Sequence, residues 1–196
     1  MLKRAFDIAG AGLGLLVLGL PLLLVGVWVK LDSPGPILFR QKRVRKGDKQ
    51  FWVLKFRTMH MNAPGPVLPQ SATQLDGFVF SPPGPDQRVT RAGRWLRKTS
   101  VDELPQLVNV LRGDMSLVGP RPEIPEMVAQ YPPTYHRRHD VRPGLTGPAQ
   151  IYGRSDLTYS EIIAYDLAYV DKHPFLQDLV ILARTALVVL LGKGAR

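Results

Sequence analysis

The longest apolar segment lies near the N-terminus, where 22 residues from Ile8 to Val29 contain no charged side chain. A helix rises about 1.5 Å per residue, so this run would extend roughly 33 Å, close to the thickness of a bilayer's hydrocarbon core. Basic residues flank the run on both sides: Lys3 and Arg4 precede it, and Lys30 and the segment 40–46 follow it. The pattern predicts a helix inserted in a membrane.

The proline and the basic flanks indicate how this helix enters the membrane. Pro21 lies inside the run, where a proline removes a backbone donor and bends or breaks a helix. A spanning helix usually has its basic residues concentrated on one side. Two basic flanks and a central proline therefore favour a re-entrant helix over a spanning helix, a cleaved signal peptide or a buried core helix.

Short strands and a long loop follow the apolar run. Ser33–Pro36 is a turn, and the segments 36–45 and 51–56 read as two short strands joined by a turn at 46–48. The next segment, 62–87, holds six prolines and three glycines and no Lys or Arg, which predicts a surface loop.

Three helices are predicted in the second half of the chain. The first is capped by Thr90, ends at Thr99, and carries the later members of a series of arginines at every third position over 88–97. That series forms either a solvated basic face or a phosphate-binding ridge. A second helix covers 105–112 and ends before a glycine, and a third covers 175–191, in the core or on the membrane surface.

Composition narrows the class of protein. The chain has 196 residues and a formal net charge of +10, and its 45% of apolar residues exclude a wholly disordered chain. Cysteine is absent, which excludes disulfides, thiolate metal sites and cysteine nucleophiles. The positive charge indicates an anionic partner, which could be nucleic acid, lipid headgroups or a phosphorylated substrate.

Asp102 and Glu103 are the strongest candidates for chemistry. They lie just ahead of the predicted helix 105–112, where the helix dipole and free backbone N–H groups favour anions. Two adjacent carboxylates can bind Mg²⁺ and supply an oxygen nucleophile to phosphorus. The alternative is helix capping, because Ser100 and Glu103 have the spacing of a capping box.

Basic residues further along the chain are candidate phosphate contacts. Arg121 lies between two prolines, which limit the entropy lost when its guanidinium binds a phosphate, although a plain rigid turn is the alternative. Arg138 and Arg142 belong to a dense basic group that precedes 143–147. No zinc site is assigned to the histidines of this half, because they lack metal-ligand spacing and nearby carboxylates. They are His136, His139 and His173.

Several motifs follow one another in a fixed order over almost the whole chain. They are Lys3-Arg4 with Asp7, 33–36, 55–59, 97–107, 111–116, 118–122 and 138–147. Together they resemble the bacterial sugar transferase family, the monotopic polyprenyl-phosphate phosphoglycosyl transferases. The smallest members of that family consist of the catalytic domain alone, and this chain is similar to them in length.

The resemblance implies transfer of a sugar-1-phosphate from a UDP-sugar to polyprenyl (undecaprenyl) phosphate, with release of UMP. It implies that Asp102 is the nucleophile of a covalent phospho-sugar intermediate and a Mg²⁺ ligand, and that Glu103 assists by positioning the metal or handling a proton. The matched motifs also supply candidate substrate-binding cations, namely Lys55, Arg57, Arg97, Arg121, Arg138 and Arg142.

We therefore expect an α+β fold, mostly helical with a small β-hairpin. A re-entrant membrane helix would cover 1–32, with its break near Pro21, and a cytoplasmic catalytic domain with interfacial helices would cover 33–196. The resemblance implies the cytoplasmic face of the bacterial inner membrane, with membrane lipid as a partner and no nucleic acid. The oligomeric state is left open, homo-oligomers included.

Two other function classes compete with this interpretation. The charge and the arginine series permit a membrane-tethered nucleic-acid-binding protein, but no helix-turn-helix or RNA-binding signature is present. A non-enzymatic membrane scaffold would leave Asp102 and Glu103 without a task.

Overall fold

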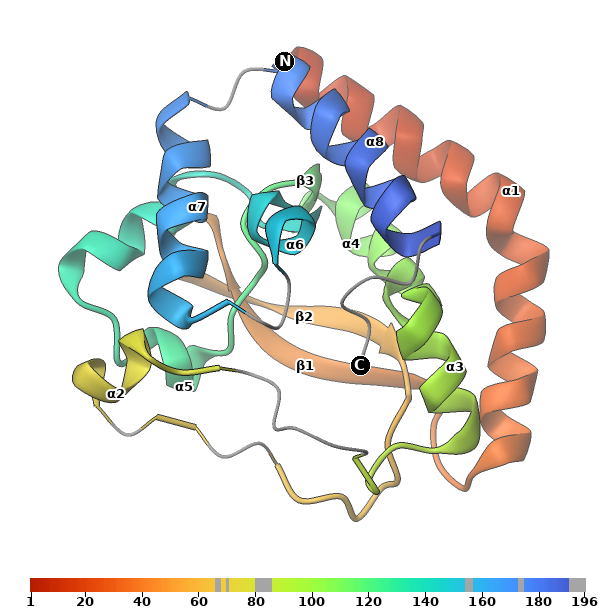
Figure 1. Cartoon of the computed structure of the whole chain (residues 1–196). Helices are drawn as coiled ribbons and strands as arrows, with labels where there is room; N and C mark the ends of the chain where they lie inside the picture. The colour runs from red at the N-terminus through yellow and green to blue at the C-terminus, as the bar shows by residue number, and fades with distance from the viewer. Residues whose placement is uncertain (66–67, 70, 80–85, 154–156, 173–174, 191–196) are drawn as a thin grey trace.

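The computed structural model describes residues 1–65, 68–69, 71–79, 86–153, 157–172 and 175–190. Helices and strands follow one another along the chain as shown in Figure 1. In order they are α1 (Leu2–Asp32), β1 (Leu38–Arg45), η1 (Lys46–Asp48), β2 (Lys49–Phe56), α2 (Ala72–Asp76), α3 (Arg91–Thr99), η2 (Val101–Gln106), α4 (Leu107–Arg112), β3 (Ser116–Val118), α5 (Pro125–Val128), η3 (Pro133–Asp140), β4 (Gly144–Thr146), α6 (Pro148–Tyr152), α7 (Tyr159–Lys172) and α8 (Phe175–Leu190).

The fold is α+β and mostly helical with a small antiparallel hairpin, as the sequence predicts. In the hairpin, Leu38 pairs with Phe56 and Arg45 with Lys49, and the 3₁₀ turn η1 joins the two strands at the predicted place. The sequence pattern did not predict the short parallel pair of β3 and β4, in which Ser116 pairs with Gly144.

Helix α1 continues through Pro21, and Figure 1 shows its axis turning part-way along its length. A proline in a helix interior lacks a donor and its ring crowds the preceding turn, which kinks the helix without ending it. The sequence predicted that the helix breaks near Pro21. In the structure the helix bends and is not interrupted.

The outer side of α1 is apolar and exposed. By length and composition α1 could cross a membrane, and almost none of its most apolar stretch is buried against the rest of the chain. Leu16 is 81% exposed and Leu20 is 70% exposed, whereas Ala11 and Val29 are buried. An exposed apolar surface of this length is typical of contact with lipid.

Both ends of α1 are held by the same body. Near its start, Leu117 N donates a hydrogen bond to Asp7 Oδ1 (3.0 Å). At its end, Ala92 N donates one to Asp32 Oδ2 (3.0 Å). The two arms of the bent helix therefore contact β3 and α3, which belong to one packed unit.

Of the three helices predicted after the loop 62–87, one differs from the prediction, and the structure adds α5, α6 and α7, which were not predicted. Thr90 Oγ1 accepts a hydrogen bond from Gly93 N (3.0 Å) and caps α3, and Gly113 ends α4 in the left-handed conformation, both as predicted. The expected helix 105–112, however, is preceded by a 3₁₀ turn, η2, which contains the two candidate carboxylates. The α-helix itself begins at Leu107.

The predicted loop 62–87 lies partly outside the described residues, because 66–67, 70 and 80–85 are not described. The described part contains α2, whose Leu75 is fully buried in a core cluster with Met127, Tyr159 and Ile163. The segment is therefore a packed part of the fold and more than a surface loop.

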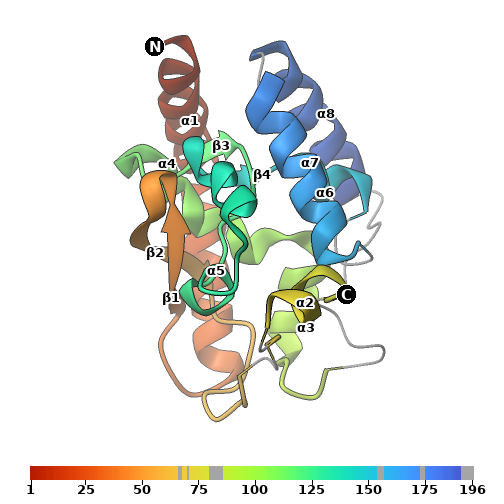
Figure 2. The ribbon, with the colours of Figure 1, turned by 90° about the vertical axis from the view of Figure 1, so that its left-hand side faces the viewer.

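A second core cluster lies under α1. Its members include Ala11, Val53, Val110, Met115 and Ile181, so it joins α1, the hairpin, α4 and α8. Figure 2 shows the hairpin and α4 beside α1. This core holds β2 and η2 against each other, and that contact positions the candidate site.

Candidate active site

The two candidate carboxylates lie on η2 and have different surroundings. Asp102 is a buried residue, and its carboxylate makes no hydrogen bond or ion pair with any residue that the structure describes. Glu103 is clamped: Lys55 Nζ donates to its Oε1 at 2.9 Å, and the Arg121 guanidinium donates to Oε1 at 2.5 Å and to Oε2 at 3.1 Å.

The 3₁₀ turn explains why neighbours in the chain differ so strongly. With about three residues per turn, successive side chains point roughly 120° apart, so Asp102 and Glu103 face different directions. Ser100, between α3 and η2, has a left-handed backbone (φ 58°) and its side chain does not cap η2. The capping-box alternative is therefore wrong, because the Glu103 carboxylate binds Lys55 and Arg121 instead.

These surroundings move the pKa values in opposite directions. Burial and then the charge of Glu103 raise the pKa of Asp102 to about 6. Burial also opposes ionisation of Glu103, but Arg121 and Lys55 outweigh it and hold the pKa of Glu103 well below its usual range. One carboxylate is therefore a permanent anion held between cations, and the other titrates close to neutral pH.

Arg97 approaches the same place from α3. A Cβ on Gly93 would lie only 2.1 Å from the carbonyl oxygen of Thr58, so this helix packs directly on the chain after β2. That contact lets Arg97 Nε donate to Thr58 Oγ1 at 3.0 Å, and the Arg97 charge acts on Asp102. Within the arginine series, Arg91 and Arg94 stay exposed to solvent, so only part of it faces the site.

Five of the predicted residues therefore come together, and we call them the charged cluster. They are Lys55, Arg97, Asp102, Glu103 and Arg121.

Arg57 is not part of the charged cluster. Its side chain is 97% buried and donates to the carbonyl oxygens of Pro36 (2.7 Å) and Ser33 (2.8 Å). It closes the turn that follows α1. The prediction that it binds substrate finds no support in this geometry, because its donors are already engaged by the backbone.

Arg138 is likewise a buried structural cation. It pairs with Asp166 at 2.5 Å and donates to the hydroxyls of Tyr131 and Tyr159 at 2.6 and 2.9 Å. Its Nη2 also donates to the carbonyl oxygen of Arg121 at 2.9 Å, so it holds the backbone that carries a member of the charged cluster.

Arg142 lies elsewhere. It is exposed, and its Nε donates to the carbonyl oxygen of Gly113 at 3.1 Å, at the end of α4. Of the six predicted substrate-binding cations, the structure thus brings Lys55, Arg97 and Arg121 to the carboxylates.

Sequence reasoning missed an ion pair next to the charged cluster, between the half-buried Arg43 and the buried Glu123. Arg43 pairs with Glu123 at 2.9 Å, and its charge acts on Arg121 and Lys55. Glu123 follows the two prolines around Arg121, and its carbonyl accepts a hydrogen bond from Val44 N. No local signal marks this pair, since the residues are 80 positions apart.

Gln106 was also missed. It is 98% buried, and its Nε2 has no hydrogen-bond partner in the part of the chain that the structure describes. It lies three positions after Glu103, which in a 3₁₀ turn places both on one side. Gln106 therefore brings a buried amide donor without a partner among these residues to the side of η2 that carries Glu103.

The family model described as "Bacterial sugar transferase" matches residues 1–192. The chain belongs to the bacterial sugar transferase family.

Relatives in this family carry related names. The chain is 44% identical to a UDP-glucose:undecaprenyl-phosphate glucose-1-phosphate transferase of Caulobacter vibrioides, over 93% of this chain and 67% of that protein. It is 43% identical to an exopolysaccharide production protein PSS of Rhizobium leguminosarum bv. phaseoli, over 99% of this chain and 98% of that protein.

A third relative is longer. The chain is 40% identical to a UDP-N-acetylgalactosamine-undecaprenyl-phosphate N-acetylgalactosaminephosphotransferase of Aeromonas hydrophila, over 100% of this chain. There it spans only 45% of the relative, slightly less than half.

The donor set of the charged cluster suits the Mg²⁺ that this family resemblance implies. Mg²⁺ binds one or two carboxylates together with substrate phosphates. The Asp102 carboxylate is the one available here, because both oxygens of Glu103 already accept hydrogen bonds from Lys55 and Arg121. The residues present therefore fit a metal held by Asp102.

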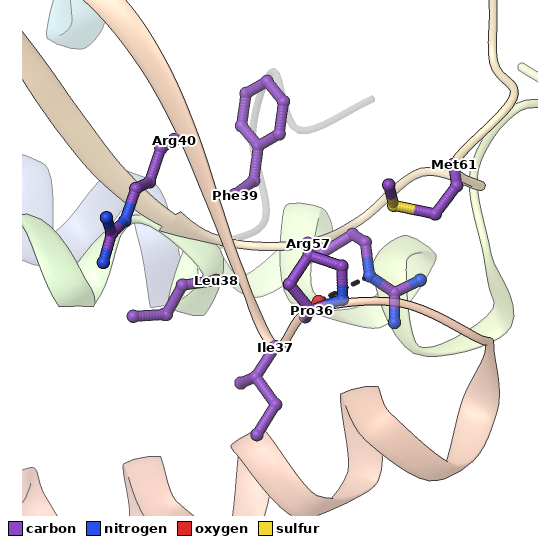
Figure 3. Close-up of a pocket in the computed structure, with 7 residues that line it drawn as sticks. All are labelled: Pro36, Ile37, Leu38, Phe39, Arg40, Arg57 and Met61. Carbon is purple, nitrogen blue, oxygen red and sulfur yellow. Dashed lines mark hydrogen bonds between the residues drawn. The ribbon is translucent and has the colours of Figure 1, made fainter.

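A separate hollow of about 600 Å³ opens beside the start of β1 (Figure 3). Its lining is mostly apolar and includes none of the charged cluster. The residues are Pro36, Ile37, Leu38, Phe39, Arg40, Arg57 and Met61. Figure 3 shows the Arg57 guanidinium hydrogen-bonded to the carbonyl oxygen of Pro36. Arg40, the other arginine of the lining, does not take part in this contact.

Proposed function

We propose that this protein is a membrane-bound phosphoglycosyl transferase. It moves a sugar-1-phosphate from a UDP-sugar to undecaprenyl phosphate and releases UMP, and so starts the assembly of a polysaccharide. The observation that carries the proposal is the buried Asp102 carboxylate, which has no partner among the described residues and lies beside an anion already neutralised by Lys55 and Arg121. The names of the relatives support the same reaction class.

The reaction proceeds in two displacements. An Asp102 carboxylate oxygen attacks the sugar-linked phosphorus of the UDP-sugar, the bond from this phosphorus to the bridging oxygen breaks, and UMP leaves. A phosphate oxygen of undecaprenyl phosphate then attacks the same phosphorus, the bond to Asp102 breaks, and a sugar diphosphate lipid leaves. Each step exchanges one phosphorus–oxygen bond for another, so the carboxylate is regenerated.

The cations of the charged cluster balance the charge of these steps. Glu103 holds Lys55 and the Arg121 fork in place, and guanidinium donors not used on Glu103 are suited to phosphate oxygens. Mg²⁺, held by Asp102 and the diphosphate, would supply further neutralisation of the phosphate oxygens. Without this balance, an anionic nucleophile would be repelled by an anionic diphosphate.

Helix α1 supports a monotopic placement at the cytoplasmic face. Its exposed apolar side chains suit the hydrocarbon region, while Asp7 and Asp32 bind both of its ends to one body. A helix whose two ends bind the same folded body keeps both ends on one side of the membrane. The bent α1 is then re-entrant, and the charged cluster lies near the lipid phosphates.

The test is release of UMP from a panel of UDP-sugars by the purified full chain with Mg²⁺ and undecaprenyl phosphate. We expect one or a few sugars to support turnover, and Asp102→Asn to abolish it, because an amide is neither a nucleophile nor a good Mg²⁺ ligand. The matched control is Asp171→Asn, a half-exposed carboxylate paired with Arg137 at the surface.

Trapping separates the covalent mechanism from direct transfer. A UDP-sugar with radiolabel in the sugar-linked phosphate should label the wild-type chain when the lipid acceptor is omitted, and should leave Asp102→Asn unlabelled. Turnover close to wild type in Asp102→Asn would show that the covalent mechanism is wrong.

A further inference from the structure

The tip of the hairpin meets η3 through three side chains of kinds that metal ions bind. His139 Nδ1 lies 2.6 Å from Asp48 Oδ1, and His136 Nδ1 lies 3.2 Å from the same oxygen. One ligand atom from each residue lies within 4.8 Å of the other two. We call Asp48, His136 and His139 the His–Asp cluster.

Local geometry brings these residues together. His136 and His139 are three positions apart on η3, and in a 3₁₀ helix residues at this spacing lie on the same side. Asp48 reaches them from the end of η1, where its backbone has a left-handed conformation (φ 56°). The 3₁₀ conformation of η3 and the approach of Asp48 are not visible in the sequence, which is why the histidines did not predict a metal site.

We propose that the His–Asp cluster binds a divalent first-row transition ion, Zn²⁺ best of all, through two imidazole nitrogens, one carboxylate oxygen and solvent. Two His and one carboxylate are a common ligand set of zinc sites with an open position. With metal–ligand bonds of about 2.0–2.1 Å, tetrahedral ligand atoms lie about 3.3 Å apart, close to the present His136–Asp48 distance.

The remaining adjustment falls on side chains that can move. The side chains of Asp48 and His136 are 53% and 40% exposed, whereas that of His139 is 7% exposed and held by stacking on Tyr131. His139 therefore provides a fixed ligand, and the other two can close around an ion. The exposed side leaves room for a water molecule as the fourth ligand.

The charges around the cluster allow a cation. Burial, and then the charge of Arg138, lower the pKa of His139. Among the arginines next to these elements, Arg45 pairs with Asp114 and Arg137 with Asp171, which offsets their charge. Lys46 and Lys49 are exposed at the hairpin tip, where their charges repel a bound cation only across solvent.

A bound ion would connect the hairpin tip to the segment behind the charged cluster. η3 also carries Arg138, which binds the carbonyl oxygen of Arg121. The ion would therefore stabilise the contact between the hairpin and η3. Its binding can be measured without any assay of transferase activity.

The experiment uses the full chain, purified in detergent without a polyhistidine tag, stripped with a chelator and supplied with excess Mg²⁺ to fill the Asp102 site. Co²⁺ is then titrated as a probe for Zn²⁺. We expect one Co²⁺ per chain with the visible absorption of a tetrahedral site, displaced by Zn²⁺. His136→Gln and Asp48→Asn should each weaken binding at least about tenfold, and the control His60→Gln, outside the cluster, should bind as wild type.

A stability measurement gives a second readout. Zn²⁺ should raise the Tm of the stripped wild-type chain by about 2 °C or more and should not raise that of His136→Gln. Equal Co²⁺ binding by His136→Gln and wild type would overturn the proposal. The proposal would also be overturned if the wild-type chain bound no Co²⁺ and the stripped His136→Gln variant had a lower Tm than the stripped wild type. The cluster would then be only a hydrogen-bonded contact.

Discussion

At the scale of single residues, the decisive contrast is between two adjacent carboxylates. Glu103 is neutralised by Lys55 and Arg121, and Asp102 is buried beside it without a hydrogen bond from the described residues. Glu103 therefore organises the cations, and Asp102 remains available as the nucleophile.

The pKa of Asp102 predicts the pH dependence of transfer. Its pKa is raised to about 6 and the attacking form is ionised, so activity is present above pH 6 and falls about tenfold per unit below it. Higher Mg²⁺ competes with the proton and should move this midpoint to lower pH. Steady-state rates of UMP release at several Mg²⁺ concentrations measure both effects, and a midpoint that stays constant would contradict metal binding by Asp102.

Arg121→Ala should lower kcat or raise KM for the UDP-sugar by at least about tenfold, since a hydrogen bond to a charged group contributes roughly 1.5–3 kcal/mol. Arg121→Lys should recover only part of the loss, because an ammonium group cannot reproduce the two-pronged contact with Glu103. Steady-state kinetics distinguish the variants. Full activity of Arg121→Ala would mean that the residue is only part of a rigid turn.

Arg138→Met should act on stability first. It leaves Asp166 as an unpaired buried carboxylate, which costs about 3–5 kcal/mol of the free energy of unfolding. The double variant Arg138→Met with Asp166→Leu should recover much of this loss, because both members of the ion pair are then replaced by apolar side chains. Denaturant unfolding measures the difference, and a fully stable Arg138→Met with a raised KM would instead make Arg138 a substrate contact.

At the scale of elements, the bend and the attached ends of α1 decide its topology. Pro21→Leu restores a backbone donor and should straighten α1, which favours full spanning and moves the N-terminus to the outer side. Because the chain has no cysteine, Leu2→Cys can be labelled on intact cells with an impermeant reagent. We expect labelling only in the Pro21→Leu background.

The control for this experiment is Lys172→Cys, an exposed residue of α7 that should react only after the cells are permeabilised. Labelling of Leu2→Cys from outside in the otherwise wild-type chain would show a spanning helix, and the re-entrant topology would then be wrong.

At the scale of the whole molecule, apolar exposure is concentrated on α1 while the chain as a whole carries a charge of +10. Leu16→Lys with Leu20→Lys places charge in the hydrocarbon region at about 2.5–3.5 kcal/mol for each residue, so much of this variant should leave the membrane fraction. Gln50→Lys with Thr134→Lys, both at exposed positions, adds the same charge and should stay. Fractionation after a high-salt wash measures the loss, and equal retention would mean that α1 is not the anchor.

Local interactions determined what the sequence alone could predict. The apolar run, the Thr90 cap, the turn at 46–48 and the glycine after α4 each depend on a few neighbouring residues, and all four features are present in the structure. The candidate carboxylates were not decided locally, because two adjacent acidic side chains before a helix also fit a cap, and the resemblance to the bacterial sugar transferase family favoured the active site.

Only the tertiary structure decided which charges meet. Glu103 binds Lys55, 48 positions earlier, and His139 approaches Asp48, 91 positions earlier, so no local pattern could pair them. Two arginines predicted to bind substrate show the same limit. Arg57 and Arg138 are engaged by backbone carbonyls and by Asp166, because a buried guanidinium must satisfy its donors with whatever oxygens the packed chain brings near.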